Sequence, residues 1–367
     1  MRTVRRLFYV DIVSAVVFVA LAFLALFFFI DFVDELRDVG TRGYSAAHAA
    51  AYCLLLAPAH LYELMPIAVL IGAIYALARL AQSSQYTILR TGGLGPGRAL
   101  WLLATLALAF GAFTFVIGDY VAPSAARIGT QLRAAFSGSL KLGRSGAWIK
   151  EHSTGPGGER SYSINVGSAE RGTLLRDVRI FEFDPDGQLL SRTAAAEAVV
   201  GRDGTWAMSD VVVTRWADAA AASVREERLA RSEWRSTLSP NVVAAAVLPV
   251  TTMSTLELWR YIGHLAVNEQ AAQLQKIQFW NRALYPFVCL VMVGLALPFA
   301  YLHARSGGVS LKVFVGIMLG VSFVLLNNVF RHLGLLGGWT PWVVAATPGA
   351  LYLFLSLAAF GWLVRFR

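Results

Sequence analysis

Apolar residues gather in six stretches, three toward each end of the chain, and each stretch is long enough to cross a membrane. A spanning helix needs about 20 mainly apolar residues, because the roughly 30 Å hydrocarbon core offers its backbone groups no water. Thr340 and Pro341 give the sixth stretch a typical helix start, as N-cap residue and first-turn proline. The pattern predicts spanning helices over residues 12–30, about 56–80, 99–118, 283–302, 313–330 and 341–364.

Between the two groups, the chain has the pattern of a β-rich domain. Apolar and polar positions alternate, as is typical of half-buried strands, and turn sequences separate the runs. The spacing favours a meander or a jelly-roll-like sheet. Farther on, Ser254 and Glu257 have the spacing of a capping box that opens an amphipathic helix. Strands are predicted near residues 162–166, 178–183, 189–196, 205–214 and 223–234.

These elements predict an α+β membrane protein, with six transmembrane helices and an extracytoplasmic β-jelly-roll-like domain inserted between helices 3 and 4. Residues 1–118 hold helices 1–3, together with a short cytoplasmic helix near residues 82–92. Residues 119–275 form the β-rich domain with its helical connections, and residues 276–367 hold helices 4–6.

The composition excludes a soluble, disordered or fibrous protein. Hydrophobic residues make up 56% of the 367 positions and charged residues 15%, whereas soluble domains carry about 25% charged residues. The net charge of +9 would indicate nucleic-acid binding if the excess lay on one solvated surface. However, the β-rich middle is neutral, with 17 basic and 17 acidic residues, and residues 276–367 carry 7 basic residues and no acidic one. We therefore expect no nucleic-acid partner.

Four short segments that carry most of the basic loop residues all fall on one side of the predicted membrane. Because such loops stay in the cytoplasm, both termini are predicted to be cytoplasmic and the β-rich domain to lie on the other side. These residues are Arg2, Arg5 and Arg6 before the first span, Arg79, Arg90 and Arg98 after the second, Arg305 and Lys312 after the fourth, and Arg365 and Arg367 after the sixth.

The sequence carries no motif for ATP binding, zinc binding or nucleophilic catalysis. The glycine-rich residues 92–97 lack the lysine of a phosphate-binding loop, and the HExxH, CxxC and GxSxG patterns do not occur. We therefore expect no catalytic residue, no cofactor and no metal in this chain. His60 and Glu63 share a helical face and are ionisable groups near a span, but their position near the membrane interface favours a structural role.

Two further features suggest contacts with other molecules. The cytoplasmic loop at residues 81–97 contains a short amphipathic stretch whose exposed apolar groups beside an arginine suggest a docking site for another protein. Gly316 and Gly320 in the fifth span allow close helix approach, although a GxxxG spacing also arises by chance. The docking stretch comprises Ser83, Ser84, Gln85, Tyr86, Ile88, Leu89 and Arg90.

The order and spacing of several segments resemble the lipopolysaccharide export permeases of the LptF/LptG family, along the whole chain. The acidic segment after the first span is more similar to the G-type subunit than to the F-type. The segments that carry the resemblance are residues 31–36 (DFVDEL), 66–80 leading into 81–84 (AQSS), 119–123 (DYVAP), and 286–299 followed by 305–308 (RSGG).

The resemblance implies a non-catalytic permease subunit of an ATP-driven ABC transporter in the bacterial inner membrane. Such a subunit pairs with an F-type permease, and two copies of a cytoplasmic ATPase, which bind ATP and Mg²⁺, dock beneath the pair. Lipopolysaccharide enters from the membrane and passes to a single-span periplasmic lipid-transfer protein and a periplasmic β-jelly-roll bridge. On this view residues 83–90 are the coupling helix. The lipid cavity and its gate would involve Asp31, Asp34, Arg37, Gly316, Gly320 and Asn327.

The chain departs from the family at two of these positions. Gln85 stands where the coupling helix commonly carries a glutamate, so a charged contact with the ATPase would become a neutral hydrogen bond. Asp31 stands where G-type relatives can place a basic residue that contacts lipid phosphates. The partner subunit would then supply the cations, or the lipid head group carries fewer phosphates.

Three other functions remain open from the sequence. A lipid-modifying membrane enzyme would use His60 and Glu63. A mechanotransmitting ABC subunit usually has four spans, which six apolar stretches disfavour. A scaffold that binds partners by strand addition at a sheet edge leaves the cytoplasmic docking stretch unexplained.

Overall fold

The computed structural model divides into two compact units. The membrane unit comprises residues 1–37, 49–126 and 273–367, and the sheet unit comprises residues 38–48 and 127–272. The structure describes residues 2–41, 43–83, 88, 96–137, 140–141, 146–155, 158–170, 174–201, 203–216, 224–236, 238, 253–267, 272–301 and 308–365.

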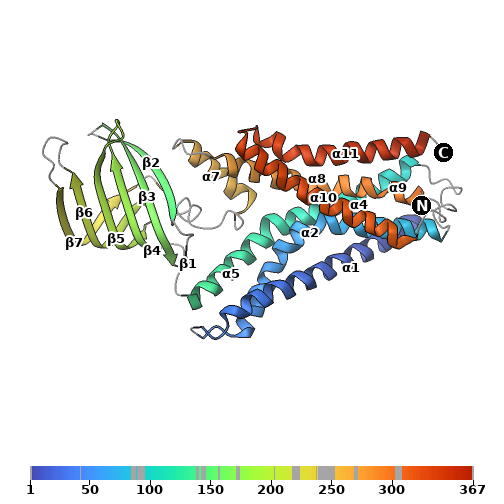
Figure 1. The fold of residues 1–367 in the computed structure, drawn as a ribbon, viewed down its shortest axis with the longest axis horizontal. Helices are drawn as coiled ribbons and strands as arrows, with labels where there is room; N and C mark the ends of the chain where they lie inside the picture. Colours follow the sequence, from blue (N-terminus) through green and yellow to red (C-terminus); the bar gives the residue numbers. More distant parts are fainter. Residues whose placement is uncertain are drawn as a thin grey trace. The chain divides into compact units, whose positions relative to one another are not determined.

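Six helices of the described chain are long and apolar enough to span a membrane, and they coincide with the six predicted spans (Figure 1). The N- and C-termini lie at the same end of the membrane unit (Figure 1). The long helices are α1 (Arg2–Glu35), α2 (Ala46–Gln82), α4 (Pro96–Val116), α8 (Gln273–Ala296), α10 (Val309–Leu336) and α11 (Pro341–Arg365). Shorter helical elements are η1 (Leu36–Asp38), η2 (Ile117–Val121), α5 (Ala122–Ser137), α7 (Thr255–Val267) and α9 (Pro298–Tyr301).

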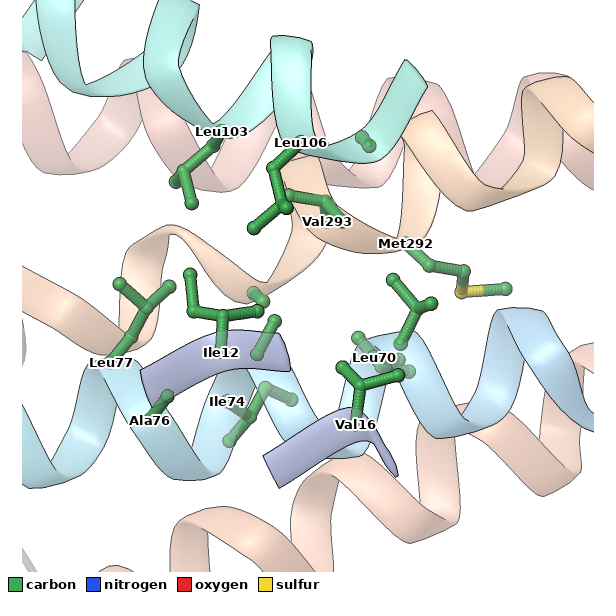
Figure 2. Packing of buried hydrophobic residues seen from close by; sticks show 14 of the residues in the cluster. Ile12, Val16, Leu70, Ile74, Ala76, Leu77, Leu103, Leu106, Met292 and Val293 are labelled. Atoms are coloured by element: carbon green, nitrogen blue, oxygen red, sulfur yellow. The ribbon is translucent and has the colours of Figure 1, made fainter. Parts of the chain in front are cut away.

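The core of the membrane unit lies where α1, α2, α4 and α8 meet (Figure 2). Ile12 and Val16 of α1 and Leu70 of α2 are buried in this cluster (Figure 2). Gly72 of α2 allows α1 to pass very close, since a Cβ there would lie 2.7 Å from the backbone of Val16. Close packing of small and branched side chains replaces the hydrophobic driving force that is absent between helices in lipid.

The third span is longer than the sequence predicts because it continues through a proline. Pro123 has no N–H, and in a regular α-helix its ring clashes with the carbonyl four residues earlier. The chain accommodates it with the π-helical turn η2, in which the Ala122 N–H donates to the Ile117 carbonyl five residues back. The helix therefore carries on as α5 instead of ending at residue 118.

The sheet unit contains one antiparallel sheet, and from β2 to β7 successive strands are neighbours (Figure 1). This order is the meander, one of the two topologies named from the sequence. The five predicted strands are confirmed as β3 to β7, while the sequence did not predict β1 and β2, both of which pair with β3. The strands are β1 (Leu140–Lys141), β2 (Ala147–Gly155), β3 (Gly158–Glu170), β4 (Leu174–Phe183), β5 (Leu189–Val200), β6 (Thr205–Trp216) and β7 (Val224–Arg235).

A row of altered backbone geometry crosses this sheet from β3 to β7. Asp177 and Asp210 have positive φ angles of 53° and 52°, a conformation that aspartate tolerates better than most residues. At this row the buried face advances by three residues, not two, so that Met208 is followed by Val211. The residues on either side of this row pair with the neighbouring strand, whereas the residues of the row itself do not take part in the regular pairing. We call it the aspartate row; its members are Gly167, Asp177, Ala196, Asp210 and Ala230.

The capping box predicted at the start of α7 is confirmed. The backbone N–H of Ser254 donates to Glu257 Oε2 at 2.9 Å, and the N–H of Glu257 donates to the Ser254 hydroxyl at 3.3 Å. The Glu257 carboxylate also binds Arg127 of α5. Burial alone would raise the pKa of Glu257, but these hydrogen bonds outweigh it, so the pKa lies below its ordinary value.

Candidate functional site

A polar pair joins α1 to α2 inside the membrane unit. Asp31 Oδ2 and His60 Nε2 are 2.7 Å apart, within hydrogen-bond distance, and each side chain is only 22% exposed. The ring of Phe27 stacks on the imidazole, with 4.9 Å between centroids. A half-buried bond of this kind contributes about 1.5–3 kcal/mol when one partner is charged. The pair therefore fixes two spanning helices against each other.

The partner of His60 differs from the one that the sequence suggested. Glu63 shares the helical face, but its side chain is exposed, and its backbone carbonyl accepts a 2.6 Å hydrogen bond from the Tyr285 hydroxyl. In the part of the chain that is described, no hydroxyl or thiol hydrogen-bonds to the His60 ring. The described residues therefore do not place a nucleophile beside His60, as the lipid-modifying enzyme would require. A sequence signal for the Asp31–His60 pair did exist, since adjacent antiparallel spans bring the end of one helix beside the start of the next.

Asp34 and Arg37, one turn farther along the chain, pair with each other. Arg37 Nη2 lies 3.5 Å from Asp34 Oδ1, and the two side chains are 81% and 65% exposed. An exposed pair at this spacing adds little stability. Both charges therefore remain accessible from solution, unlike the charge of Asp31.

Gly316 and Gly320 lie at the contact of α10 with α2. A Cβ on Gly316 would lie 2.7 Å from Cδ1 of Ile74, and one on Gly320 would lie 2.9 Å from Cγ2 of Ile67. Both glycines are buried, so the GxxxG spacing serves helix packing. Asn327, farther along the same helix, is half-buried.

The outward faces of α1 and α10 are strongly apolar. In a soluble protein such faces would mark an interface, and in a membrane protein they meet lipid or a neighbouring subunit. Exposed large apolar side chains on these helices include Phe18 and Phe29 of α1, and Leu311, Phe314, Leu325 and Leu336 of α10.

Most of the docking stretch lies outside the described residues. Ser83 caps the end of α2, where its hydroxyl donates to the Leu80 carbonyl at 3.3 Å. Ile88 is helical, and its side chain is 66% exposed. The remaining members, Ser84, Gln85, Tyr86, Leu89 and Arg90, are not among the described residues.

Comparison with known proteins gives a consistent result over nearly the full chain. The family model described as "Lipopolysaccharide export system permease LptF/LptG" matches residues 6–362. The chain is 27% identical, over 331 residues and 89% of both chains, to the lipopolysaccharide export system permease protein LptG of Escherichia coli strain K12. It is 25% identical, over 333 residues and again 89% of both chains, to the protein of that name from Haemophilus influenzae.

Proposed function

The chain belongs to the LptF/LptG family of lipopolysaccharide export system permeases, and on that premise we propose that it is the G-type permease subunit of an ATP-driven lipopolysaccharide exporter. The observation that carries this proposal is the match of residues 6–362, which takes in all six spans and the inserted sheet. The LptG relatives from two bacteria support the G-type assignment.

We propose that the membrane unit pairs with an F-type permease through the outward faces of α1 and α10. Their exposed apolar side chains support this contact. The glycine contact of α10 with α2 would let α10 slide as a gate. Gly316 and Gly320 carry no side chain that would interlock with Ile74 and Ile67 of α2. With Asp31 held by His60, the cations that contact lipid phosphates would come from the partner subunit.

The energy for transport would come from a separate ATPase, bound in two copies on the cytoplasmic side. The absence of a phosphate-binding loop from the whole sequence supports this division. Residues 83–90 would form the coupling helix, with Ile88 as an apolar anchor. On the other side of the inner membrane, the sheet unit would pass lipopolysaccharide to the single-span transfer protein and the periplasmic bridge.

Co-purification tests the ATPase contact. Tagged full-length chain, expressed with its partners and extracted in mild detergent, should retain the ATPase. Ile88→Glu should retain about tenfold less, because a charge replaces an apolar anchor. Val224→Glu is the matched control, since Val224 is 59% exposed on β7 in the other unit, and it should retain the wild-type amount. An ATPase that never co-purifies with wild type, or that binds Ile88→Glu equally well, would contradict the proposal.

A further inference from the structure

Two stacked aromatic rings lie on the face of the sheet that points away from its apolar core. Trp148 of β2 is 53% exposed, whereas the next residue, Ile149, is buried in the core, because successive side chains of a strand point to opposite faces. The ring of Trp148 stacks on that of Phe181 of β4, with 5.9 Å between centroids and 21° between ring planes. Strand β3 lies between these two strands. The two rings therefore form a flat aromatic surface that reaches across three strands.

Polar side chains border the two rings along one row of paired residues. Phe181 pairs with Ser163 of β3 on one side and with Arg192 of β5 on the other. The row continues to Lys150 of β2 and to Thr214 of β6. Residues that are directly opposite on paired strands project from the same face of the sheet. Two cations and two hydroxyl groups therefore lie beside the aromatic rings. We call Trp148, Lys150, Phe181 and Arg192 the outer patch.

The two cations of the outer patch are not balanced by carboxylates of the described chain. Among the described side chains, no ion pair includes Lys150 or Arg192. Glu226, the acidic residue at the β7 end of the row, pairs with Arg228 instead. The Arg192 guanidinium lies 6.0 Å from the centre of the Phe181 ring, where a cation is attracted to an aromatic face. Its Nε is buried without a hydrogen-bond partner in the described part of the chain. The patch therefore favours an anionic ligand.

The flat shape of the outer patch distinguishes between anionic ligands. The face of an aromatic ring carries partial negative charge, so it attracts the C–H groups of a flat ring that lies on it. A sugar ring offers such C–H groups, and its hydroxyl groups can hydrogen-bond to Ser163 and Thr214. An acidic protein segment would instead depend on apolar side chains that fill a pocket and exclude water. The exposed ring of Trp148 therefore fits a sugar better than a peptide.

We propose that the outer patch binds a soluble acidic glycan. Its sugar rings would stack on Trp148, and its carboxylates would bind the guanidinium of Arg192 and the ammonium of Lys150. The site lies on the opposite face of the sheet from the apolar core. It depends on the sheet unit alone, so it would stand even if the chain did not export lipopolysaccharide.

Weak-affinity chromatography tests the proposal. The full-length chain, co-expressed with its partners and purified in mild detergent, is passed over immobilised hexagalacturonic acid as the acidic glycan probe. Two reference columns carry a neutral galactose hexamer, which has sugar rings without charge, and hexaglutamate, which has charge without sugar rings. Wild type should be retained most strongly by the galacturonate column. Equal retention by hexaglutamate would indicate a site for acidic peptides, and equal retention by the neutral glycan would indicate no role for charge; either result overturns the proposal.

Aromatic variants test the stacking contact. Trp148→Ala should weaken binding to the galacturonate column about fivefold, because the stacked ring is lost. Trp148→Phe keeps an aromatic ring and should bind nearly as wild type does. Trp259→Ala is the matched control, since Trp259 of α7 is 59% exposed and lies outside the outer patch. Wild-type retention of Trp148→Ala, or an equal loss in Trp259→Ala, would contradict the proposed site.

Charge variants test the anion contact. Arg192→Gln should weaken binding to the galacturonate column about tenfold, because a hydrogen bond between charged groups is lost. Arg231→Gln removes the same charge from an exposed position of β7 outside the outer patch, and it should elute as wild type does. All variants are compared at equal monodispersity and melting temperature. Equal losses in the two arginine variants would mean that net charge alone retains the protein, which overturns the proposal.

Discussion

At the scale of single residues, an acidic group takes a position where a basic one was expected. Asp31 does not face an anionic ligand alone, because His60 lies 2.7 Å away on the next helix. The carboxylate thus contributes to the α1–α2 contact, because it is held by a hydrogen bond within its own chain. The substitution of a basic residue by Asp31 is matched by a partner within the same chain.

The Asp31–His60 pair should be measurable as a coupling energy. His60→Ala should lower the melting temperature in detergent by an amount that corresponds to about 1–2 kcal/mol, because Asp31 loses its partner in a half-buried site. Asp31→Asn should cost a similar amount, and the double variant should cost less than the sum of the two. Asp34→Asn on the exposed pair is the control and should change stability by less than about 0.5 kcal/mol. Strictly additive losses would mean that the two side chains do not interact.

At the scale of elements, glycines decide how closely the spans approach. Gly72 faces the backbone of Val16, which cannot move without the whole of α1. Gly316 faces only the tip of a flexible isoleucine. The two contacts are equally short, yet they should respond differently to an added methyl group.

Gly72→Ala should therefore destabilise the membrane unit by about 1–3 kcal/mol through overpacking, whereas Gly316→Ala should cost less because Ile74 can change rotamer. Gly349→Ala in α11, where a Cβ meets no atom within 4 Å, should be neutral or slightly stabilising. Thermal unfolding of the three variants in one detergent gives the order. If Gly72→Ala were as stable as Gly349→Ala, α1 and α2 could not approach each other as closely at Gly72 as the structure shows.

Local signals explain which elements the sequence could predict. The spans and the capping box at Ser254 depend on neighbouring residues only, and each is found where expected, apart from the extension of the third span. Strand β2 was not predicted because its second half is polar. Its Glu151 is nevertheless buried, and its carboxylate accepts a 2.6 Å hydrogen bond from the Ser236 hydroxyl, 85 positions away. The order of the spans could have suggested that Asp31 lies near His60. The contact itself, like the α2 partner of Gly316, depends on helix rotation, which hydropathy does not encode.

At the scale of the whole molecule, both termini lie at one end of the membrane unit, as an even number of spans requires. The positive residues of the short loops predict that this end is cytoplasmic. The sheet unit, inserted after the third span, would then lie in the periplasm.

Labelling with a membrane-impermeant maleimide tests this orientation. The native cysteines, Cys53 and Cys289, are both free and buried, so background labelling should be low. Asp186→Cys in the β4–β5 turn should react in cells with a permeabilised outer membrane, whereas Arg6→Cys should react only after lysis. The reverse pattern would invert the proposed topology.

The aspartate row also bears on how the sheet avoids mispairing during folding. In an ordinary meander a strand can slip by two residues and still keep every side chain on its own face, so that such an error costs little free energy. Here a two-residue slip would carry residues across the row, where the spacing of buried positions changes, and would turn apolar groups such as Val211 outward. The positive φ angles of Asp177 and Asp210 thus help to fix the strand register, because even a two-residue slip would raise the free energy of the sheet.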